Sequence, residues 1–565
     1  MDSKINILIR NEVENFKKNM RDPILMITII SIMILVFLFI LYPLIKILSE
    51  SIFYNGKISL EHYKNIFKND STLEIIKNTV VLGIIVSTIS TLIGFLFAYA
   101  SAYLKIKNKG IFNAVAILPM ISPPFVIALS TILLFGRNGF ITRGIFGIRD
   151  FDVYGLKGLI IVQTLTFFPV AYLMLVGLLK SIDPSVEEAA RDLGASRWNV
   201  FKTITLPLMV PGLANAFLLV FIQSIADFGN PMVIGGNYTT LAIQIYLQGI
   251  GNYDIGGGTA LAIILLIISI ILFTIQKYYV STKSYVTVTG KVSRERELTD
   301  SPKIVKPVYY IIVAISIFVG LLYILVPIGS FIKLWGADYS FSLNHYKYVF
   351  GLGMKPIIDT TMLALVATPI SGILGMIIAF LVVRKKFIGK TFVEGTTMLA
   401  IAIPGTVIGL GYVLSYNTKP LVLTGTATIL IIAFIMRSMP VGVRSGIAAL
   451  QQIDPSIEEA ANVLGADSKK VFTSVTVPMI KPAFFSGLTY TFIRSMTLVS
   501  TVIFLVSANY NLLTAAIMSQ IDVGKIGVAS AYSTILIIIV GIVVSIMQFT
   551  LSRMGVNINN GEGGK

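Results

Sequence analysis

Residues 183–196 read Asp-Pro-Ser-Val-Glu-Glu-Ala-Ala-Arg-Asp-Leu-Gly-Ala-Ser, and residues 454–467 read Asp-Pro-Ser-Ile-Glu-Glu-Ala-Ala-Asn-Val-Leu-Gly-Ala-Asp. Each stretch is followed at the same distance by a proline, Pro207 or Pro478. A long stretch that recurs at an equivalent place is typical of a duplicated structural unit. The sequence therefore predicts two homologous halves that present the same kind of surface twice.

The repeat extends well beyond these two stretches. Residues 78–82 align with 359–363, and residues 123–129 align with 404–410. The offset between the copies shortens once, around residues 138–154, which indicates extra loop in the first half. We predict a first half at 1–285 with its core at about 74–277, a linker at 286–306, and a second half at 307–565 with its core at about 357–550.

The composition points to a membrane protein, because 55% of the residues are apolar and only 13% are charged. Apolar stretches that reach the roughly 20 residues needed to cross a bilayer occur about twelve times. They begin near residues 24, 78, 112, 156, 207 and 260 and near residues 308, 359, 393, 421, 482 and 528. Backbone amides in hydrocarbon must be bonded within their own segment. The predicted fold class is therefore an all-α polytopic membrane protein with about six transmembrane helices in each half.

The basic residues set the predicted orientation, because loops that stay in the cytoplasm carry an excess of lysine and arginine. Basic residues crowd the N-terminal tail, and counting spans from it places the basic loops at 105–109, 277–306 and 384–390 on the same side. Both repeated stretches also fall there. We expect the N- and C-termini to be cytoplasmic. The same topology explains the net charge of +17 better than nucleic-acid binding does.

Residue types that support other chemistry are scarce. Cysteine is absent, which excludes disulfides, thiolate metal sites and cysteine nucleophiles. The only two histidines, His62 and His345, lie in repeated segments, and no carboxylate cluster accompanies them at ligand spacing. We interpret both as structural, and a two-histidine metal site is the alternative.

The repeated stretch carries the residues that begin and end a short helix. Asp183 can cap a helix that starts at Pro184, where the missing amide proton is not needed. Two acidic residues then lie in the first turn, where the helix dipole favours negative charge, and a glycine can end the helix in a left-handed cap. A second short helix can start at Ser196. The residues concerned are Glu187, Glu188, Ala189, Ala190 and Gly194 in the first half and Glu458, Glu459, Ala460, Ala461 and Gly465 in the second.

The order Glu-Ala-Ala, three residues, Gly, nine residues, then Ile/Val-x-Leu/Val-Pro resembles the motif of permease subunits in binding-protein-dependent type I ABC importers. Both copies match, and the repeat around them covers nearly the whole chain. The stretch 227–238 is similar to fused permeases assigned to ferric iron and to relatives for phosphonates or sugar phosphates. The resemblance implies two tandem permease domains in a bacterial cell membrane, with the residues 187–194 and 458–465 as coupling elements.

The resemblance also implies partners: two copies of an ABC ATPase, one on each repeated loop, and an extracytoplasmic solute-binding protein. A phosphate-binding loop needs Gly-x-x-x-x-Gly-Lys-Ser/Thr. The nearest approach here, Gly389-Lys390-Thr391, has Arg384 in place of the first glycine. We therefore expect that this chain is not an enzyme and binds no cofactor, and that ATP and Mg²⁺ belong to the partner ATPase.

Burying an ionisable side chain in the bilayer is energetically unfavourable, so such residues usually face a cavity or a partner and indicate the transport route. They are Asp227, Arg437 and Arg494, and Asn230 follows the first of them in a glycine-rich stretch. Arginine can hold phosphate or carboxylate bidentately, so we hypothesise an anionic or anion-complexed solute of the ferric iron, phosphonate or sugar phosphate class. Alternatively, Arg494 pairs with Asp227, or Arg437 satisfies carbonyls freed by Pro440.

Two other functions are alternatives to an importer that works by alternating access. An ion-coupled secondary transporter needs titratable or ion-coordinating groups in the middle of the membrane, and the spans contain few carboxylates. A membrane-bound enzyme needs a nucleophile, a base and an orienting group on one side, and no such grouping is evident. The ATP-driven importer is therefore the leading interpretation.

Overall fold

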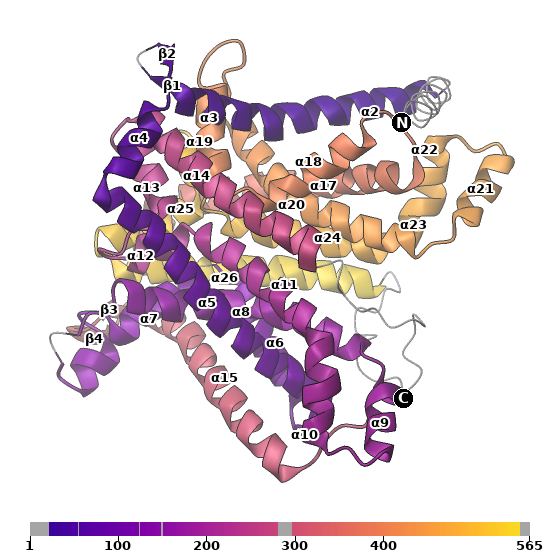
Figure 1. Cartoon of the computed structure of the whole chain (residues 1–565). Helices are drawn as coiled ribbons and strands as arrows, with labels where there is room; N and C mark the ends of the chain where they lie inside the picture. Colours follow the sequence, from indigo (N-terminus) through magenta and orange to yellow (C-terminus); the bar gives the residue numbers. More distant parts are fainter. Residues whose placement is uncertain (1–21, 55, 124, 149–150, 281–295, 554–565) are drawn as a thin grey trace. The chain divides into compact units, whose positions relative to one another are not determined.

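The computed structural model describes residues 22–54, 56–123, 125–148, 151–280 and 296–553 (Figure 1). Within these ranges ten helices are long and apolar enough to cross a membrane, and two more pairs reach that length across a bend. This agrees with the predicted number of about twelve spans and confirms the all-α polytopic class. The sequence did not predict the two short antiparallel β-hairpins.

One compact unit consists of the described parts of residues 51–354 and of residues 515–537. Most of it comes from the first half of the chain. Its main elements are β1 (Phe53–Tyr54), β2 (Lys57–Ile58), α4 (Glu61–Lys68), α5 (Asp70–Tyr103), α6 (Lys109–Ile121), α7 (Phe125–Phe135), α8 (Leu156–Ser181), α9 (Pro184–Asp192), α10 (Arg197–Val200), α11 (Leu206–Ile225), α12 (Gly229–Ile234), α13 (Leu241–Tyr246), α14 (Ile255–Thr274), α15 (Pro302–Ser330), β3 (Ile332–Leu334), β4 (Asp338–Phe341) and α16 (Asn344–Gly351).

The other compact unit consists of the described parts of residues 1–50, 355–514 and 538–565. Most of it comes from the second half. Four helices are shared between the units: α3 (Tyr42–Ile52), α17 (Met354–Arg384), α25 (Leu513–Asp522) and α26 (Ile526–Arg553). The main elements wholly within this unit are α2 (Pro23–Val36), α18 (Lys390–Ala402), α19 (Gly405–Tyr416), α20 (Ala427–Gln451), α21 (Pro455–Val463), α22 (Ser468–Val471), α23 (Val477–Met479) and α24 (Lys481–Thr497).

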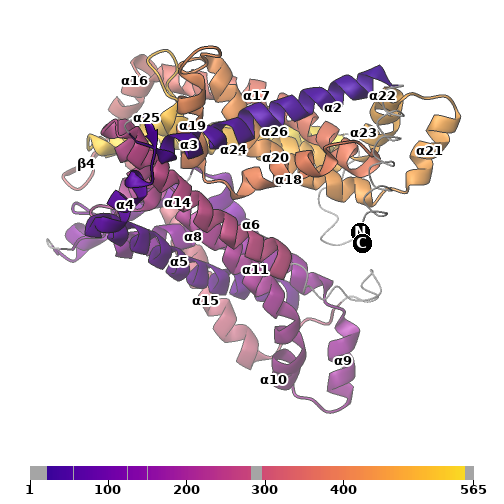
Figure 2. The same cartoon turned by 45° about the horizontal axis from the view of Figure 1, so that its top comes forward.

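The first spanning helix of the chain packs with the second half. Between α2 and α3 it contains a π-helical turn at Phe37–Leu41, where the regular hydrogen-bond ladder is interrupted. The hydroxyls of Tyr412 and Tyr416 in α19 donate to two carbonyls of this turn. Close approach depends on Gly411, because a Cβ there would lie 2.9 Å from Cβ of Pro43. Both views show α2 running beside α18 (Figures 1 and 2).

The first helix of the second half, α15, packs with the first half in turn. The Ser130 hydroxyl of α7 donates to the Leu322 carbonyl of α15, and the indole Nε1 of Trp335 donates to the Leu133 carbonyl at 2.8 Å. Figure 2 shows α15 next to α5. The compact units therefore exchange their first helices relative to the two halves of the sequence.

The two histidines anchor the hairpins. His62 Nε2 lies 3.1 Å from the Phe53 carbonyl oxygen, and His345 Nε2 lies 2.9 Å from the Ile332 carbonyl oxygen. A Cβ at Gly256 would lie 2.1 Å from Cε1 of His62, so the imidazole needs a glycine beside it. Each imidazole thus contacts the backbone of its own hairpin, as a structural role requires. The described residues contain no cluster of three histidine, aspartate or glutamate side chains that could hold a metal.

One predicted span was wrong, and another begins a few residues later than expected. The apolar stretch near residue 112 does not run as one span, because α6 ends at Ile121 and a separate helix, α7, begins at Phe125. Pro123 lies in this break, and a proline disfavours helical backbone in the residue before it. The span expected near residue 421 begins at Ala427. In the second half, α18 and α19 form one broken span with a bend of 114°.

We expect Gly94→Ala to destabilise the packing of α5 on α8. A Cβ at Gly94 would lie 2.7 Å from both Cβ of Ala171 and the backbone nitrogen of Tyr172, so overpacking should cost about 1–3 kcal/mol. The aligned Gly375→Ala should cost less, since its nearest neighbour would be 3.3 Å away. Thermal unfolding of the detergent-purified chain measures both. Gly177→Ala in α8, with nothing within 4 Å, is the control, and equal melting temperatures for all variants would contradict this account.

Candidate functional site

The first repeated stretch folds as a helix, a turn and a second helix, as predicted. The Asp183 carboxylate accepts a hydrogen bond from the Ser185 amide at 3.0 Å and caps α9. Gly194 ends α9 with a φ of +89°, in the left-handed region. The Ser196 hydroxyl then accepts from the Asn199 amide at 3.3 Å and caps α10.

The second repeated stretch has the same geometry. The Asp454 carboxylate accepts a hydrogen bond from the Ser456 amide at 2.9 Å before α21. Hydrogen bonding to Ser456 lowers the pKa of Asp454. Gly465 has a φ of +85° after α21. The Asp467 carboxylate accepts from the Lys470 amide at 2.7 Å at the start of α22. The predicted capping residues and the glycines that end the helices are therefore confirmed in both copies.

Each short helix exposes apolar side chains that the sequence reasoning missed. Leu193 is 90% exposed and the aligned Leu464 is 87% exposed. Val186 and Ile457, which also align, are exposed as well. Figure 1 shows α9 beside α10 and α21 beside α22. The leucine directly after each short helix and the aliphatic side chain within it are exposed at aligned positions in both halves, which favours a docking surface. The alignment of apolar residues beside the glycine was the available signal.

The two glutamates of each stretch have different surroundings, which the sequence did not distinguish. Glu187 and Glu458 are both only 7% exposed. Thr205 donates to Glu187 at 2.6 Å, Thr476 donates to Glu458 at 3.1 Å, and burial raises the pKa of Glu187. These two acids therefore hold each loop against its own half. The remaining members of the predicted set, Glu188, Glu459, Ala189, Ala190, Ala460 and Ala461, are half-buried or exposed.

The glycine–lysine–threonine stretch at 389–391 is a helix start. Gly389 has a φ of +89° and precedes the first residue of α18. A Cβ at this glycine would lie 2.8 Å from Cε of Met33, so the turn is packed against α2. Arg384, which occupies the place of the first phosphate-loop glycine, is bonded to Glu458. This geometry is that of a membrane-helix connection.

Asp227 is held within its own unit by neutral donors. Its carboxylate accepts from the side-chain amides of Gln163 and Asn230, both at 2.9 Å, and from the Gly229 amide at 3.1 Å. The carboxylate thereby holds the first residues of α12, and Asn230 in that helix is fully buried. The structure thus brings Asp227 and Asn230 together. A role for them in transport stays a prediction.

Arg437 and Arg494 lie on neighbouring helices, α20 and α24, near enough for their charges to interact. Arg437 donates to the carbonyls of Ala400 and Ile403, at 3.2 and 2.8 Å, where α18 breaks. It therefore satisfies carbonyls at the end of α18 and not those that Pro440 frees. Among the residues that the structure describes, no hydrogen bond or ion pair of the Arg494 side chain is seen.

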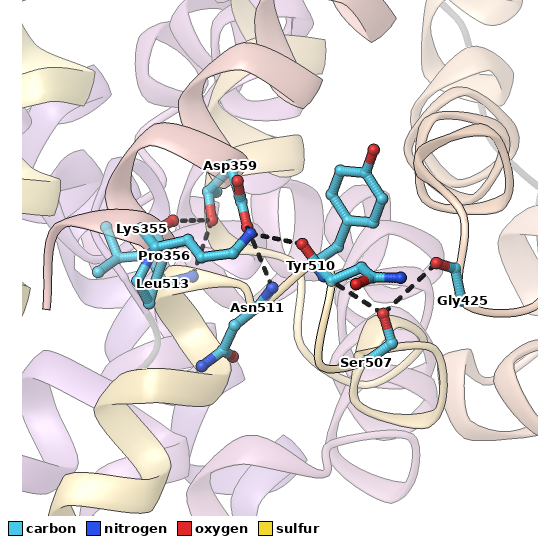
Figure 3. Close-up of polar contacts among 10 residues, drawn as sticks. Lys355, Pro356, Asp359, Gly425, Ser507, Tyr510, Asn511 and Leu513 are labelled. Carbon is cyan, nitrogen blue, oxygen red and sulfur yellow. Dashed lines mark hydrogen bonds and ion pairs between the residues drawn. The ribbon is translucent and has the colours of Figure 1, made fainter.

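At the other end of α17 a polar cluster fixes the loop before α25 (Figure 3). Lys355 Nζ lies 2.9 Å from the Asp359 carboxylate, and the Asn511 amide donates to the same oxygen at 3.2 Å. The ammonium also lies 5.5 Å from the centre of the Tyr510 ring. The loop is therefore tied to the first turns of α17 by its backbone and by one aromatic ring.

The first half has a corresponding loop, but the residue that aligns with Lys355 is acidic. The Tyr238 hydroxyl donates to the Asn78 carbonyl at 2.9 Å, and Glu74 occupies the position that aligns with Lys355. The first half therefore has no counterpart of the Lys355–Asp359 ion pair, and a cavity of about 560 Å³ lies at this place. Its polar lining residues are Glu74, Asn78, Arg137, Asp152, Tyr154, Asn237 and Tyr238. The two halves therefore differ in charge and shape at this end.

Each half combines membrane-spanning helices with one capped short helix, which has a buried, hydrogen-bonded glutamate and is followed by an exposed leucine. This arrangement is that of a membrane transport permease. The family model for the "binding-protein-dependent transport system inner membrane component" matches residues 90–284 and 371–554, together more than half of the chain. The chain belongs to this family. It is a non-enzymatic permease subunit of an ABC importer and a multi-pass protein of the bacterial inner membrane, and proteins of this family work with an ATPase and a solute-binding protein.

Individual relatives agree with this assignment. The ferric transport system permease protein FbpB of Actinobacillus pleuropneumoniae is 40% identical over 92% of this chain and 77% of its own length. A Haemophilus influenzae protein named as a ferric transport system permease, FbpB 1, is 39% identical over 86% of this chain and 79% of its own length. The molybdenum transport system permease protein ModB of Escherichia coli is 30% identical over 38% of this chain and 94% of its own length.

Proposed function

We propose that this chain is the translocation subunit of a ferric iron importer and that it moves iron inward by alternating access. The observation that carries this proposal is the pair of short helices α9 and α21, hereafter the coupling helices, each with an exposed leucine and a buried glutamate. Relatives named for ferric transport support the choice of solute over phosphonates and sugar phosphates.

The coupling helices would receive two copies of a separate ATPase, one on each. That ATPase would bind ATP and Mg²⁺, while this chain would bind no cofactor. Helix α8 leads through one residue, Ile182, to the cap of α9, and α10 continues through a π-helical turn into α11. A displacement of α9 is therefore transmitted to two spanning helices. The second half has the same connections, from α20 to α21 and from α22 towards α24.

Iron would pass this chain as an anionic complex. Ferric iron prefers oxygen ligands such as carboxylates, whereas the charges of Arg437 and Arg494 would repel a bare trivalent cation. An anion bound to the iron would reverse this interaction and could accept hydrogen bonds from the Arg494 guanidinium. Asp227 and Asn230 would shape the route in the other unit through their buried network.

Reconstitution tests this proposal directly. We would place the chain, its ATPase and its binding protein in proteoliposomes and follow radiolabelled ferric iron. Accumulation that requires ATP and survives an uncoupler of the proton gradient is expected. Uptake that follows the proton gradient would favour an ion-coupled secondary transporter. ATP-driven uptake of a phosphonate or a sugar phosphate without iron would overturn the proposed solute.

The two arginines are expected to respond differently to replacement by alanine. Arg437→Ala leaves two carbonyls at the break of α18 without a donor, at about 1–3 kcal/mol each, so the melting temperature should fall. Arg494→Ala breaks no bond of the described residues and should instead lower iron uptake about tenfold at unchanged melting temperature. Calorimetry and uptake separate the two effects. Normal uptake by Arg494→Ala would rule out contact with the solute.

A further inference from the structure

The buried glutamate of the second coupling helix has a basic partner from its own half. Arg384, the last residue of α17, places its Nε 3.1 Å from Glu458 Oε1. Its Nη2 also donates to the carbonyls of Leu450 and Ile453, both at 2.9 Å. One guanidinium therefore joins the end of α17, the end of α20 and the first turn of α21.

The first half has no arginine at the corresponding place. The offset that aligns residues 78–82 with 359–363 puts Tyr103, the last residue of α5, opposite Arg384. The Tyr103 hydroxyl donates to Glu187 Oε1 at 2.8 Å but carries no positive charge. A buried carboxylate without a directly paired cation is unfavourable. Arg191 of α9 acts on Glu187 only through its charge, so the first half lacks the directly paired positive charge that Arg384 provides in the second.

Arg296, from the segment that connects the two halves, supplies this charge. Its Nη1 lies 3.6 Å from Glu187 Oε2, and its Nη2 donates to the Ile182 carbonyl at 2.8 Å. Ile182 aligns with Ile453, so Arg296 reaches the same two partners, a carbonyl and a glutamate, as Arg384 does in the second half. The guanidinium carbon stacks 3.8 Å from the centre of the Tyr103 ring, and only 12% of the side chain is exposed.

The backbone on the C-terminal side of Arg296 is fixed to α5. The Thr299 amide donates to the Tyr103 carbonyl at 2.8 Å, and the Lys105 amide donates to the Thr299 carbonyl at 2.9 Å. Three residues later α15 begins. Burial lowers the pKa of Arg296 to about 10, which leaves it charged at neutral pH. Residues 296–299 of the connecting segment are thus docked where α5 meets α9.

We propose that Arg296 is the positioning residue of the first coupling helix, and that the connection between the halves completes the first coupling site. The connection is then a working part of the permease in addition to joining its halves. The first coupling helix depends on it, whereas the second is complete within its own half. This inference rests on the proposed coupling function of α9 for its effect on transport, but the positioning itself can be measured without any partner.

Hydrogen exchange of the full chain in lipid nanodiscs tests the positioning. Arg296→Ala should speed amide exchange in α9 about tenfold or more and leave α21 unchanged. Lys303→Ala, which removes an exposed cation seven residues away, is the matched control and should change neither helix. Unchanged exchange in α9 of the Arg296→Ala chain would overturn the proposal.

A transplanted arginine gives a second test that does not depend on how stable the single variant is. Tyr103→Arg in the Arg296→Ala background copies the arrangement of the second half and should return α9 exchange, chain accumulation and ATP-driven uptake to within about threefold of the original. Failure of this pair to restore α9 would overturn the assignment. Restored α9 order with uptake that never depended on it would instead contradict the coupling function of α9, which separates the two proposals.

Discussion

Replacing Leu193 and Leu464 together by aspartate is expected to abolish ATP-driven uptake while the chain still inserts and folds. Both side chains are almost fully exposed, so the change breaks no contact within the described residues. If the two leucines are anchors in clefts of the ATPase, burying two new carboxylates there should weaken association at least about 100-fold. Copurification of the ATPase, together with uptake in proteoliposomes, measures the effect.

Two controls define the meaning of this result. Leu352→Asp changes another exposed leucine, after α16, and should leave uptake and association unchanged. Leu193→Asp alone should weaken only one of two docking events, so an intermediate loss of association would support one ATPase on each coupling helix. Full uptake and normal association in the double variant would show that the coupling helices do not dock the ATPase.

The second large effect is expected for Arg384→Met. The change leaves Glu458 buried without its cation and removes the donor to two carbonyls, so α21 should be destabilised by about 3–5 kcal/mol. At 1.4 kcal/mol for each factor of ten, amide exchange in α21 should rise by at least about 100-fold if the opening is local. Uptake should fall as well, because the helix is no longer held in one orientation.

A double-mutant cycle separates the ion pair from simple loss of packing. Glu458→Gln in the Arg384→Met background removes the charge that was left buried, so the double variant should be more stable than Arg384→Met alone. Exchange in α9, which belongs to the other half, serves as the internal reference. Additive effects of the two replacements would mean that Arg384 and Glu458 do not act as a pair.

Local patterns in the sequence predicted the coupling helices almost completely. Asp183 and Gly194 act on the backbone within a few residues of themselves, so capping rules that need no tertiary information are sufficient. The spans were equally predictable, because the bilayer requires length and apolarity. The break between α6 and α7 was missed because the hydropathy continues across it, although Pro123 was a visible signal.

Contacts between distant segments were not predictable in the same way. Glu187 and Glu188 are adjacent and chemically identical, and only the position of Thr205 and Tyr103 in space decides which one is buried. The sequence did not predict that Arg437 donates to carbonyls at the end of α18, which lies more than thirty residues away in the sequence. Both outcomes depend on which helices pack together.

The amino-acid sequence alone determined that this protein is a duplicated membrane permease with a capped short helix in each half, because repeats, hydropathy and caps act over short distances or over whole segments. Only the tertiary structure decided that α2 and α15 pack with the opposite halves. It also decided that Arg296 brings to Glu187 the positive charge that Tyr103, which aligns with Arg384, does not carry. These arrangements depend on burial of charge and on close approach of helices, which no short stretch of sequence encodes.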